Sequence, residues 1–170
     1  NESHHLRSVL RLQTGKRIEV FDGKGSLSEA VIEEISKKKT TLRILNTIST
    51  SQYSPLLTIA VSIPKKDRLD WLIEKCTELG ADRIWPLICE RTVKLGNSNK
   101  MDRYQKIALN ASKQSERLFL PQIRNPEIIS NIFNDLIEND STKKIYFGGF
   151  SEKSIFSKDV KFAKIDISPE

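Results

Sequence analysis

The hydrophobic pattern of the chain changes near Pro55, and this change limits the folds that it can adopt. Before Pro55, short runs alternate apolar and polar residues and are separated by turn-forming residues, as in antiparallel strands. After it, residues 56–63 form a continuous apolar run, and a helical pattern follows that stops at Gly80. Apolar strands followed by helices are typical of parallel sheets. We therefore expect a small antiparallel β-barrel over residues 1–50 and an α/β domain over residues 55–170.

Three strands are predicted in the first part from its alternating apolar residues. They cover residues 17–21, 27–35 and 40–45. The segments between them, at 22–25 and 36–39, are rich in Gly, Lys and Ser and predict turns. Residues 46–55 are polar and show no period, which predicts a linker.

The second part is predicted to alternate strands and helices. The expected order is strand 56–63, helix 67–79, strand 83–89, helix 100–118, a helix from Pro126, and strands 144–147 and 163–167. Pro86 cannot donate to a ladder, which favours an edge strand or a strand end for residues 83–89. Leu79 is expected on the apolar face of the first helix, and Ser115 and Leu118 on that of the second. Trp71 is expected to pack in the core or against a helix in preference to stacking on a base.

Composition excludes several classes of protein. Hydrophobic residues make up 38% and charged residues 29%, and no apolar run approaches the roughly 18 residues of a membrane span. Cys76 and Cys89 have no Cys-x-x-Cys partner and no spaced histidines nearby, so we expect no metal site and a reducing cytoplasm. The short motifs of NTPases, dinucleotide-binding folds, zinc hydrolases and serine hydrolases are absent from the sequence.

Positive charge is concentrated in one stretch of the chain. The 170 residues include 28 Lys and Arg against 22 Asp and Glu, a formal net charge of +6. Residues 83–124 contain nine basic and three acidic side chains, so the excess lies there. Such a stretch is typical of a surface that faces phosphates. A basic surface that only maintains solubility would give the same count.

The expected strand ends carry candidate binding residues, because open α/β sheets bind ligands beyond the carboxyl ends of their strands. Arg91 lies two residues beyond the expected strand 83–89, and a guanidinium there can bind a phosphate with two hydrogen bonds. An ion pair with Glu90 or Glu116 is the structural alternative for Arg91. The other basic and glycine candidates at strand ends are Lys65, Arg68, Lys94 and Gly148.

The second expected helix carries a polar stripe. Its members recur every three or four residues and are Arg103, Lys106, Asn110, Lys113 and Arg117. A phosphate backbone could lie along this stripe, with Lys113 and Arg117 among its contacts. An ordinary solvated helix face is the alternative.

Several blocks of the sequence share order and spacing with one known family. They are HLRSVLRL at 5–12, VFDG at 20–23, PKKDRLDW at 64–71, EKCTELG at 74–80, PLICER at 86–91, KIA at 106–108, QSER at 114–117 and PQI at 121–123. In this series the chain resembles the bacterial 16S rRNA (uracil-N3) methyltransferases of the SPOUT superfamily.

The resemblance implies a PUA-like β-barrel followed by an α/β-knot methyltransferase domain. It also implies methylation of N3 of a uridine in 16S rRNA of the small ribosomal subunit, with S-adenosylmethionine as methyl donor, in a cytoplasmic homodimer. A sulfonium methyl is already electrophilic, so this chemistry needs no metal, and Arg91 is a candidate helper that stabilises the uracil anion. Arg7 and Arg11, in the first block, are expected to position the RNA.

The resemblance also places the cofactor. The family's cofactor loop reads Gly-Pro-Glu-Gly-Gly, and Ser168, Pro169 and Glu170 look like its beginning, with Ser in place of the first Gly. With Gly148 at the preceding strand end, these are the expected cofactor-binding residues. The knot segment would follow Glu170, and the chain does not begin with Met, so we expect it to be a piece of a longer protein.

Two other functions fit parts of the pattern. A noncatalytic RNA-binding module would use the same basic stripe and barrel. A nucleotide-binding α/β protein of flavodoxin-like shape would explain the sheet but not the charge concentrated in residues 83–124. Calorimetry with S-adenosylmethionine on the full-length protein distinguishes these alternatives.

Overall fold

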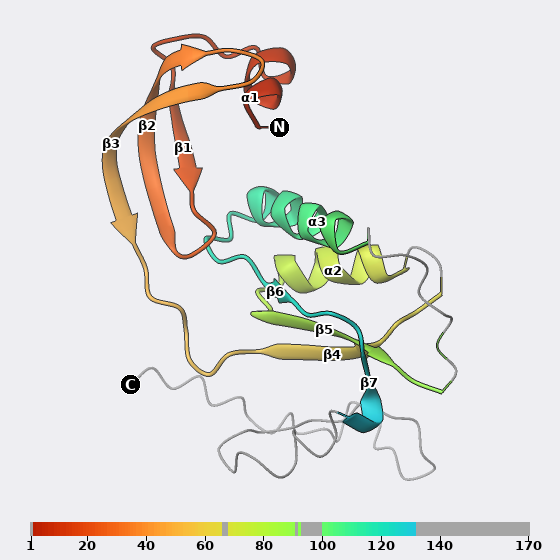
Figure 1. Ribbon diagram of the computed structural model, residues 1–170. Helices are drawn as coiled ribbons and strands as arrows, with labels where there is room; N and C mark the ends of the chain where they lie inside the picture. The colour runs from red at the N-terminus through yellow and green to blue at the C-terminus, as the bar shows by residue number, and fades with distance from the viewer. Residues whose placement is uncertain (1, 66–67, 91, 93–99, 132–170) are drawn as a thin grey trace, which may run out of the picture. The chain divides into compact units, whose positions relative to one another are not determined.

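The computed structural model describes residues 2–65, 68–90, 92 and 100–131, all within one compact unit, residues 1–133 (Figure 1). Its elements follow in the order α1 (Glu2–His4), a wide helical turn η1 (His5–Val9), β1 (Arg17–Phe21), β2 (Ser26–Ile35), β3 (Thr40–Ser49), β4 (Thr58–Ser62), α2 (Arg68–Glu78), β5 (Arg83–Ile88), α3 (Lys100–Gln114), β6 (Gln122–Ile123) and β7 (Glu127–Ile128).

The N-terminal strands form an antiparallel sheet in the order β1-β2-β3. Arg17 lies opposite Val31 and Phe21 opposite Leu27, which confirms the three predicted strands and their antiparallel pairing. Alternate side chains of β2 point inward, and Ala30 and Ile32 are fully buried. The described strands make an open sheet and do not close into a barrel.

The third strand is longer than predicted, and its end was wrongly assigned to the linker. Residues 46–49 continue β3 and pair with residues 26–29 of β2. The Ser28 and Thr47 hydroxyls lie 2.8 Å apart across the two strands. A polar strand end of this kind is held by its cross-strand partners, which a hydrophobic pattern does not reveal.

The second sheet is parallel, as predicted for an α/β fold. β5 pairs in parallel with β4 on one side and with β6 and β7 on the other. The expectation that the first of these strands is buried on both faces is wrong, because Thr58, Ala60 and Ser62 are exposed. In the described part of the sheet β4 is an edge strand. Its half-buried residues, Ile59 and Val61, alternate with the exposed ones and therefore share one face of the sheet.

Pro86 lies in the interior of the described sheet, so the prediction of an edge strand or strand end for residues 83–89 is wrong. The carbonyl of Ile84 accepts a hydrogen bond from the Arg124 amide, on the side of β6. Backbone groups alternate sides along a strand, so Pro86 faces that same side. On that side β6 pairs with residues 83–84 and β7 pairs with residues 87–88. Pro86, which has no backbone N–H to donate, therefore lies in the gap between β6 and β7, where no strand needs that hydrogen bond.

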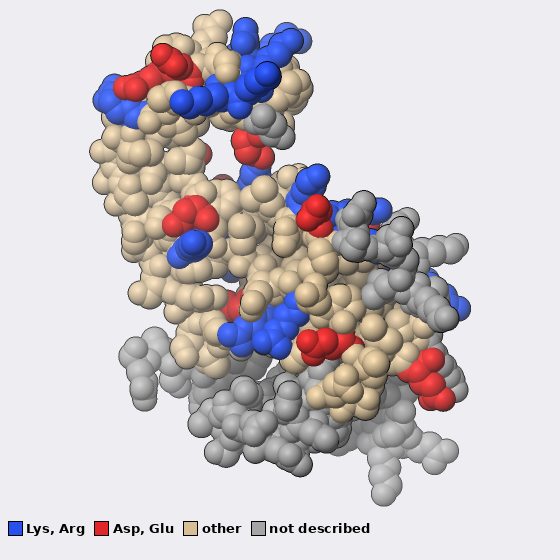
Figure 2. All heavy atoms as spheres, viewed as in Figure 1, with Lys and Arg blue, Asp and Glu red and all other residues tan. Residues whose placement is uncertain are grey.

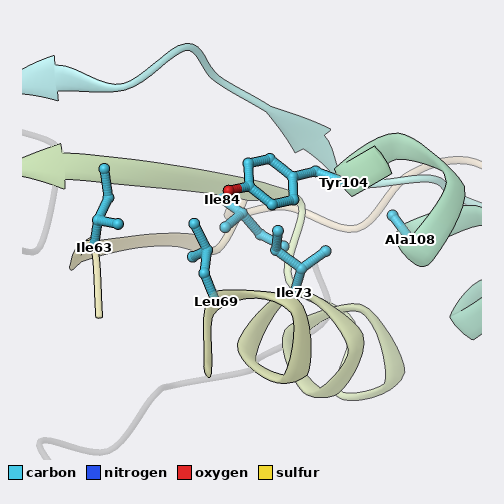
Figure 3. Close-up of a cluster of buried hydrophobic side chains, with 6 residues drawn as sticks. All are labelled: Ile63, Leu69, Ile73, Ile84, Tyr104 and Ala108. Atoms are coloured by element: carbon cyan, nitrogen blue, oxygen red, sulfur yellow. The ribbon is translucent and has the colours of Figure 1, made fainter. Parts of the chain in front are cut away.

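Helices α2 and α3 lie side by side on one face of the parallel sheet (Figure 1). Leu69 and Ile73 from α2 point toward Tyr104 of α3 and Ile84 of β5 in the core (Figure 3). The cluster is completed by Ile63 and Ala108, and every member is at most 8% exposed. Burying a side chain of this size stabilises the fold by about 1.5–3 kcal/mol, so this cluster holds the helices on the sheet.

Both helices end earlier than their apolar patterns predict. Gly80 has φ +85° and caps α2, as expected, but Leu79 lies beyond the helix and is 79% exposed. α3 ends at Gln114 because Glu116 adopts φ +56° and turns the chain away, which removes Ser115 and Leu118 from the helix. Trp71 is 64% exposed, since it lies on the side of α2 opposite Leu69 and Ile73, so its expected place in the core is wrong.

The expected helix from Pro126 begins later than predicted. Glu127 and Ile128 are extended and pair with Leu87 and Ile88, and helical structure starts only at 129. The edge of β5 offers a hydrogen-bonding partner there, which local periodicity does not report. The expected strands 144–147 and 163–167 lie outside the described residues. None of the described helices has the length and apolar character needed to cross a membrane.

Candidate nucleic-acid and cofactor site

The carboxyl edge of the parallel sheet is formed by the ends of β4 and β5. The amide of Ile63 donates to the carbonyl of Leu87 at 3.0 Å, which holds the two strand ends together. The hydroxyls of Ser62 and Thr92 lie 3.4 Å apart, and Thr92 Oγ1 accepts a hydrogen bond from the Cys89 amide at 2.7 Å. This edge therefore presents neutral hydroxyl groups of the kind that hydrogen-bond to a ribose or a base.

Two of the predicted strand-end residues are described at this edge. Lys65 follows β4 and Arg68 begins α2, and both side chains are exposed. Their charges can therefore reach a phosphate without first leaving a buried ion pair. The other predicted residues of this edge and of the cofactor loop lie outside the described residues: Arg91, Lys94, Gly148, Ser168, Pro169 and Glu170.

The predicted polar stripe is largely engaged within the protein, and its last member, Arg117, lies beyond the end of α3. Lys113 Nζ lies 2.6 Å from a carboxylate oxygen of Glu2. Arg117 donates from Nε and Nη2 to the carbonyl of Glu78, at 3.1 and 3.0 Å. Arg103 forms an ion pair with Asp70 of α2. A phosphate that used this stripe would have to compete with these contacts.

The pair between Glu2 and Lys113 has a consequence for charge. Its hydrogen bond holds the pKa of the Glu2 carboxyl below its ordinary value, and the charge of Lys113 acts in the same direction. The Glu2 carboxylate offsets the charge of Lys113 across this ion pair, which makes the lysine a weaker candidate for RNA than the sequence indicates.

Lys and Arg side chains gather at the end of the N-terminal sheet near η1 (Figure 2). Arg7 in η1 and Arg11 just after it are exposed, as expected for residues that position RNA. Sequence reasoning treated the lysines of the turn between β2 and β3 as turn residues only. We name the basic end patch as the following exposed residues: Arg7, Arg11, Lys16, Lys37, Lys38 and Lys39.

The signal for these missed residues was present in the sequence. Lys37, Lys38 and Lys39 are consecutive, and Ser36 closes their turn by accepting from and donating to Lys39 backbone groups at 2.9 and 2.8 Å. Among the described ion pairs, none involves these three lysines. A run of lysines on an ordered turn is a good phosphate-binding surface, because no internal contact has to break first.

The described part of the chain has two surface hollows near these residues. One of about 350 Å³ lies on the N-terminal sheet, where the ion pair of Arg17 and Glu29 borders the exposed Ile48. The other, of about 190 Å³, lies between the segment 50–53, the turn after α2 and the segment 116–120. The described residues contain no cluster of His, Cys, Asp and Glu that could hold a metal ion.

A parallel sheet covered by helices and preceded by an antiparallel sheet defines an α/β protein, and its exposed basic ends are of the kind that face nucleic acids. Comparison with known families refines this class. Residues 52–165 match the RNA methyltransferase domain, and residues 1–45 match the RNA methyltransferase PUA domain. The chain belongs to the RNA methyltransferase family, which confirms the resemblance found in its sequence.

Individual relatives agree. The chain is 39% identical over 124 residues to the ribosomal RNA small subunit methyltransferase E of Synechocystis, covering 72% of this chain and 40% of the relative. It is 30% identical over 175 residues to the protein of that name from Buchnera aphidicola, covering 98% and 68%. The crystal structure of the Neisseria gonorrhoeae ribosomal RNA small subunit methyltransferase E bound to S-adenosyl methionine has a TM-score of 0.69 and 28% identity, and the match covers 78% of this chain and 56% of that one. The chain thus spans between two fifths and about two thirds of the length of these relatives.

Proposed function

We propose that this chain is part of an S-adenosylmethionine-dependent methyltransferase that methylates N3 of a uridine in 16S rRNA. The match of residues 52–165 to the RNA methyltransferase domain carries the proposal. The names of the relatives from Synechocystis and Buchnera aphidicola support a small-subunit rRNA substrate. The cofactor in the Neisseria gonorrhoeae structure supports S-adenosylmethionine as donor.

The proposal includes the finer architecture that the resemblance implies. The sheet β1-β2-β3 would belong to a PUA-like barrel, residues 1–50, and the parallel sheet to an α/β-knot domain, residues 55–170. The working unit would be a homodimer in the cytoplasm, where small ribosomal subunits are assembled. No protein metal ligand is needed, since the reaction transfers a methyl group that is already electrophilic.

The described residues fit a cofactor that contains a nucleoside. The Ser62 and Thr92 hydroxyls at the carboxyl edge are neutral hydrogen-bonding groups, and this is where open α/β sheets bind ligands. Gly148, Ser168, Pro169 and Glu170 are proposed to hold the rest of it. When bound, S-adenosylmethionine supplies a methyl group on a positively charged sulfur.

The chain's own residues would act on the RNA. Arg7, Arg11, Lys65, Arg68 and Lys94 are proposed to contact phosphates and hold the strand. Lys113 and Arg117 would join them only by exchanging their contacts with Glu2 and Glu78 for a phosphate. Arg91 would place its guanidinium near O2 or O4 of the uracil, where negative charge develops when N3 loses its proton. These residues are thus proposed to position the RNA and stabilise charge, while the N3 proton passes to a base and the methyl group passes from sulfur to N3.

The direct test is methyl transfer by the full-length protein. Radiolabelled S-adenosylmethionine is incubated with small ribosomal subunits that lack the modification, and the RNA is digested to nucleosides. We expect label in 3-methyluridine. Label in another nucleoside, or cofactor binding without transfer, would contradict the proposed reaction.

Variants of Arg91 test its proposed role. Arg91→Ala should lower kcat for methyl transfer by about 100- to 1,000-fold, the range for loss of one charge-stabilising donor. Arg91→Lys keeps the charge but not the paired donors, so its kcat should lie between those of Arg91→Ala and the unchanged protein. Unchanged cofactor affinity in both variants, by calorimetry, is the control. A kcat that neither substitution changes would remove Arg91 from the mechanism.

A further inference from the structure

The turn between β1 and β2 is held in one conformation by its own residues. It contains Asp22 and Gly23, the end of the sequence block Val20 to Gly23, to which the proposed function assigns no role. Asp22 Oδ1 accepts hydrogen bonds from the amides of Lys24 at 2.7 Å and Ser26 at 3.0 Å. Gly23 and Gly25 have φ +73° and +103°, a region that favours glycine. The turn therefore presents a defined backbone edge.

This edge pairs with the segment 118–120, which we name the docking segment. The amide of Gly25 donates to the carbonyl of Leu118 at 3.1 Å, and the amide of Leu120 donates to the carbonyl of Gly23 at 3.0 Å. Lys24 and Phe119 form an antiparallel bridge between them. The turn thus adds a short strand pair that joins the N-terminal sheet to the chain beyond α3.

A side chain at either glycine would collide with a packed neighbour, and at Gly25 that neighbour includes backbone. A Cβ on Gly25 would lie 2.5 Å from the carbonyl oxygen of Thr50 and would overlap the ring of Phe119. A Cβ on Gly23 would lie 2.5 Å from a methyl carbon of Leu120. The Thr50 amide also donates to the Gly25 carbonyl at 2.9 Å, so three segments meet at this turn.

The docking segment is itself fixed to the parallel sheet. Just before it, the Arg117 guanidinium donates twice to the Glu78 carbonyl at the end of α2. Just after it, the Gln122 amide donates to the Asp82 carbonyl at 2.8 Å, and β6 pairs with β5. Asp82 also accepts from Gln52 at 2.7 Å and from the Leu57 amide at 2.6 Å. The turn is therefore connected by hydrogen bonds to the sheet that carries the carboxyl edge.

We propose that Gly23 and Gly25 are positioning residues that lock the N-terminal sheet onto the methyltransferase fold, so that RNA held by the basic end patch presents its target uridine in one place. The inference rests on the proposed function for the nature of the ligand. The lock itself rests only on the contacts of the turn with the docking segment. Displacement of a reacting group by about 1 Å can cost 100-fold in rate, so a loosened lock should slow the reaction.

The test replaces Gly25 with Ala in the full-length protein and measures two quantities. The first is the distance distribution between spin labels at Glu34→Cys in β2 and Gln105→Cys in α3, in a background that carries Cys76→Ala and Cys89→Ala. We expect a narrow distance distribution in the labelled protein that keeps Gly25 and a broad distribution in the labelled Gly25→Ala variant. The second is the steady-state kinetics of methyl transfer, where we expect kcat to fall by about 10- to 100-fold with KM for RNA nearly unchanged.

Gly15→Ala is the matched control. Gly15 has φ +86°, so alanine there is strained in the same way, but nothing lies within 4 Å of the added Cβ. This variant should keep the narrow distance distribution and the original kcat. A distribution as narrow in Gly25→Ala as in Gly15→Ala would overturn the lock.

A second variant covers the case in which Gly25→Ala does not fold. Phe119→Ala removes the ring that packs on Gly25 and leaves the backbone of the turn unchanged. It should broaden the distribution to a smaller degree and lower kcat in the same direction. Failure of the proposed function is recognised separately, since the protein without turn substitutions would then transfer no methyl group while the label distances still report the lock.

Discussion

Single residues with left-handed backbone conformations mark the points where this chain must change direction. Gly80 ends α2 at φ +85°, where its amide donates to Thr77 and the next amide, of Ala81, donates to Cys76. Its neighbour in space is the Arg117 guanidinium, which is held by the Glu78 carbonyl. Gly80 therefore serves both as a helix cap and as space for an arginine.

A pair of substitutions separates these two roles of Gly80. Gly15→Ala should cost about 1 kcal/mol of unfolding free energy, the strain of an alanine at positive φ in open space. Gly80→Ala should cost more, because its Cβ would lie 2.8 Å from Nη1 of Arg117. Urea unfolding of both variants measures the difference. Equal losses would mean that the guanidinium moves aside freely.

The phenol of Tyr104 links stability to pH at the alkaline end. Burial, and secondarily the negative charge of Asp70, raise the pKa of Tyr104 above its ordinary value of 10.0. The folded state then binds this proton more tightly than the unfolded state, so its contribution is complete below pH 10 and is lost as pH rises through the folded pKa.

Thermal unfolding as a function of pH tests this link. The melting temperature should fall above about pH 10 and should fall less steeply in Tyr104→Phe. Tyr53→Phe, at a tyrosine that is 83% exposed, is the control and should follow the unchanged protein. Identical alkaline profiles for Tyr104→Phe and the control would contradict the assignment.

At the scale of elements, small residues allow α2 and α3 to approach each other closely. Ala108, Ala111 and Ser112 of α3 are at most 3% exposed, as is Thr77 of α2. The Thr77 hydroxyl donates to the Ile73 carbonyl at 2.7 Å, so its polar atom is satisfied within its own helix. The larger side chains Leu69 and Ile73 then reach past this contact into the core cluster.

Truncation of the central side chain should reveal how much this packing contributes. Ile73 is fully buried, so Ile73→Ala should lower the unfolding free energy by about 2–5 kcal/mol, and Ile73→Val by about 0.5–1.5 kcal/mol. Leu79→Ala, at an exposed position, should change it by less than about 0.5 kcal/mol. Denaturant unfolding checks all three, and a small loss in Ile73→Ala would indicate that the helices close over the cavity.

At the scale of the whole molecule, part of the basic charge in residues 83–124 is held in contacts within the protein. Arg117 and Lys113 each hold a contact within the protein. The lysines of the turn between β2 and β3 are exposed and outside the described ion pairs. RNA affinity is thus expected to depend more on the basic end patch than on the α3 stripe.

Salt dependence of RNA binding tests that expectation. The substitution of Lys37, Lys38 and Lys39 by Gln should reduce the slope of log K against log salt by roughly one for each lost phosphate contact. Arg43→Gln, at a residue of the same sheet that is paired with Glu33 at 3.1 Å, is the control and should leave the slope nearly unchanged. A larger reduction of the slope by Arg117→Gln than by the lysine variant would show that the RNA contacts Arg117 in preference to the basic end patch.

The local pattern of the sequence was sufficient for most of the elements. Alternating apolar residues located β1, β2 and the start of β3, and the apolar run before an amphipathic segment located β4 and α2. Gly80 was predicted as a cap because glycine adopts positive φ without a steric cost, and here it directly follows a helical apolar pattern. The motif series also sufficed for the family, since order and spacing along the chain are sequence properties.

Only the tertiary structure decided which partners each residue meets. The interior position of Pro86, the extended pairing of residues 127–128 and the polar end of β3 all depend on hydrogen bonds to strands distant in sequence. The same reason explains the candidate site, where Glu2 reaches Lys113 and Glu78 reaches Arg117 across the fold. Periodicity reports which face of an element is apolar, but it carries no information about which distant group lies against that face.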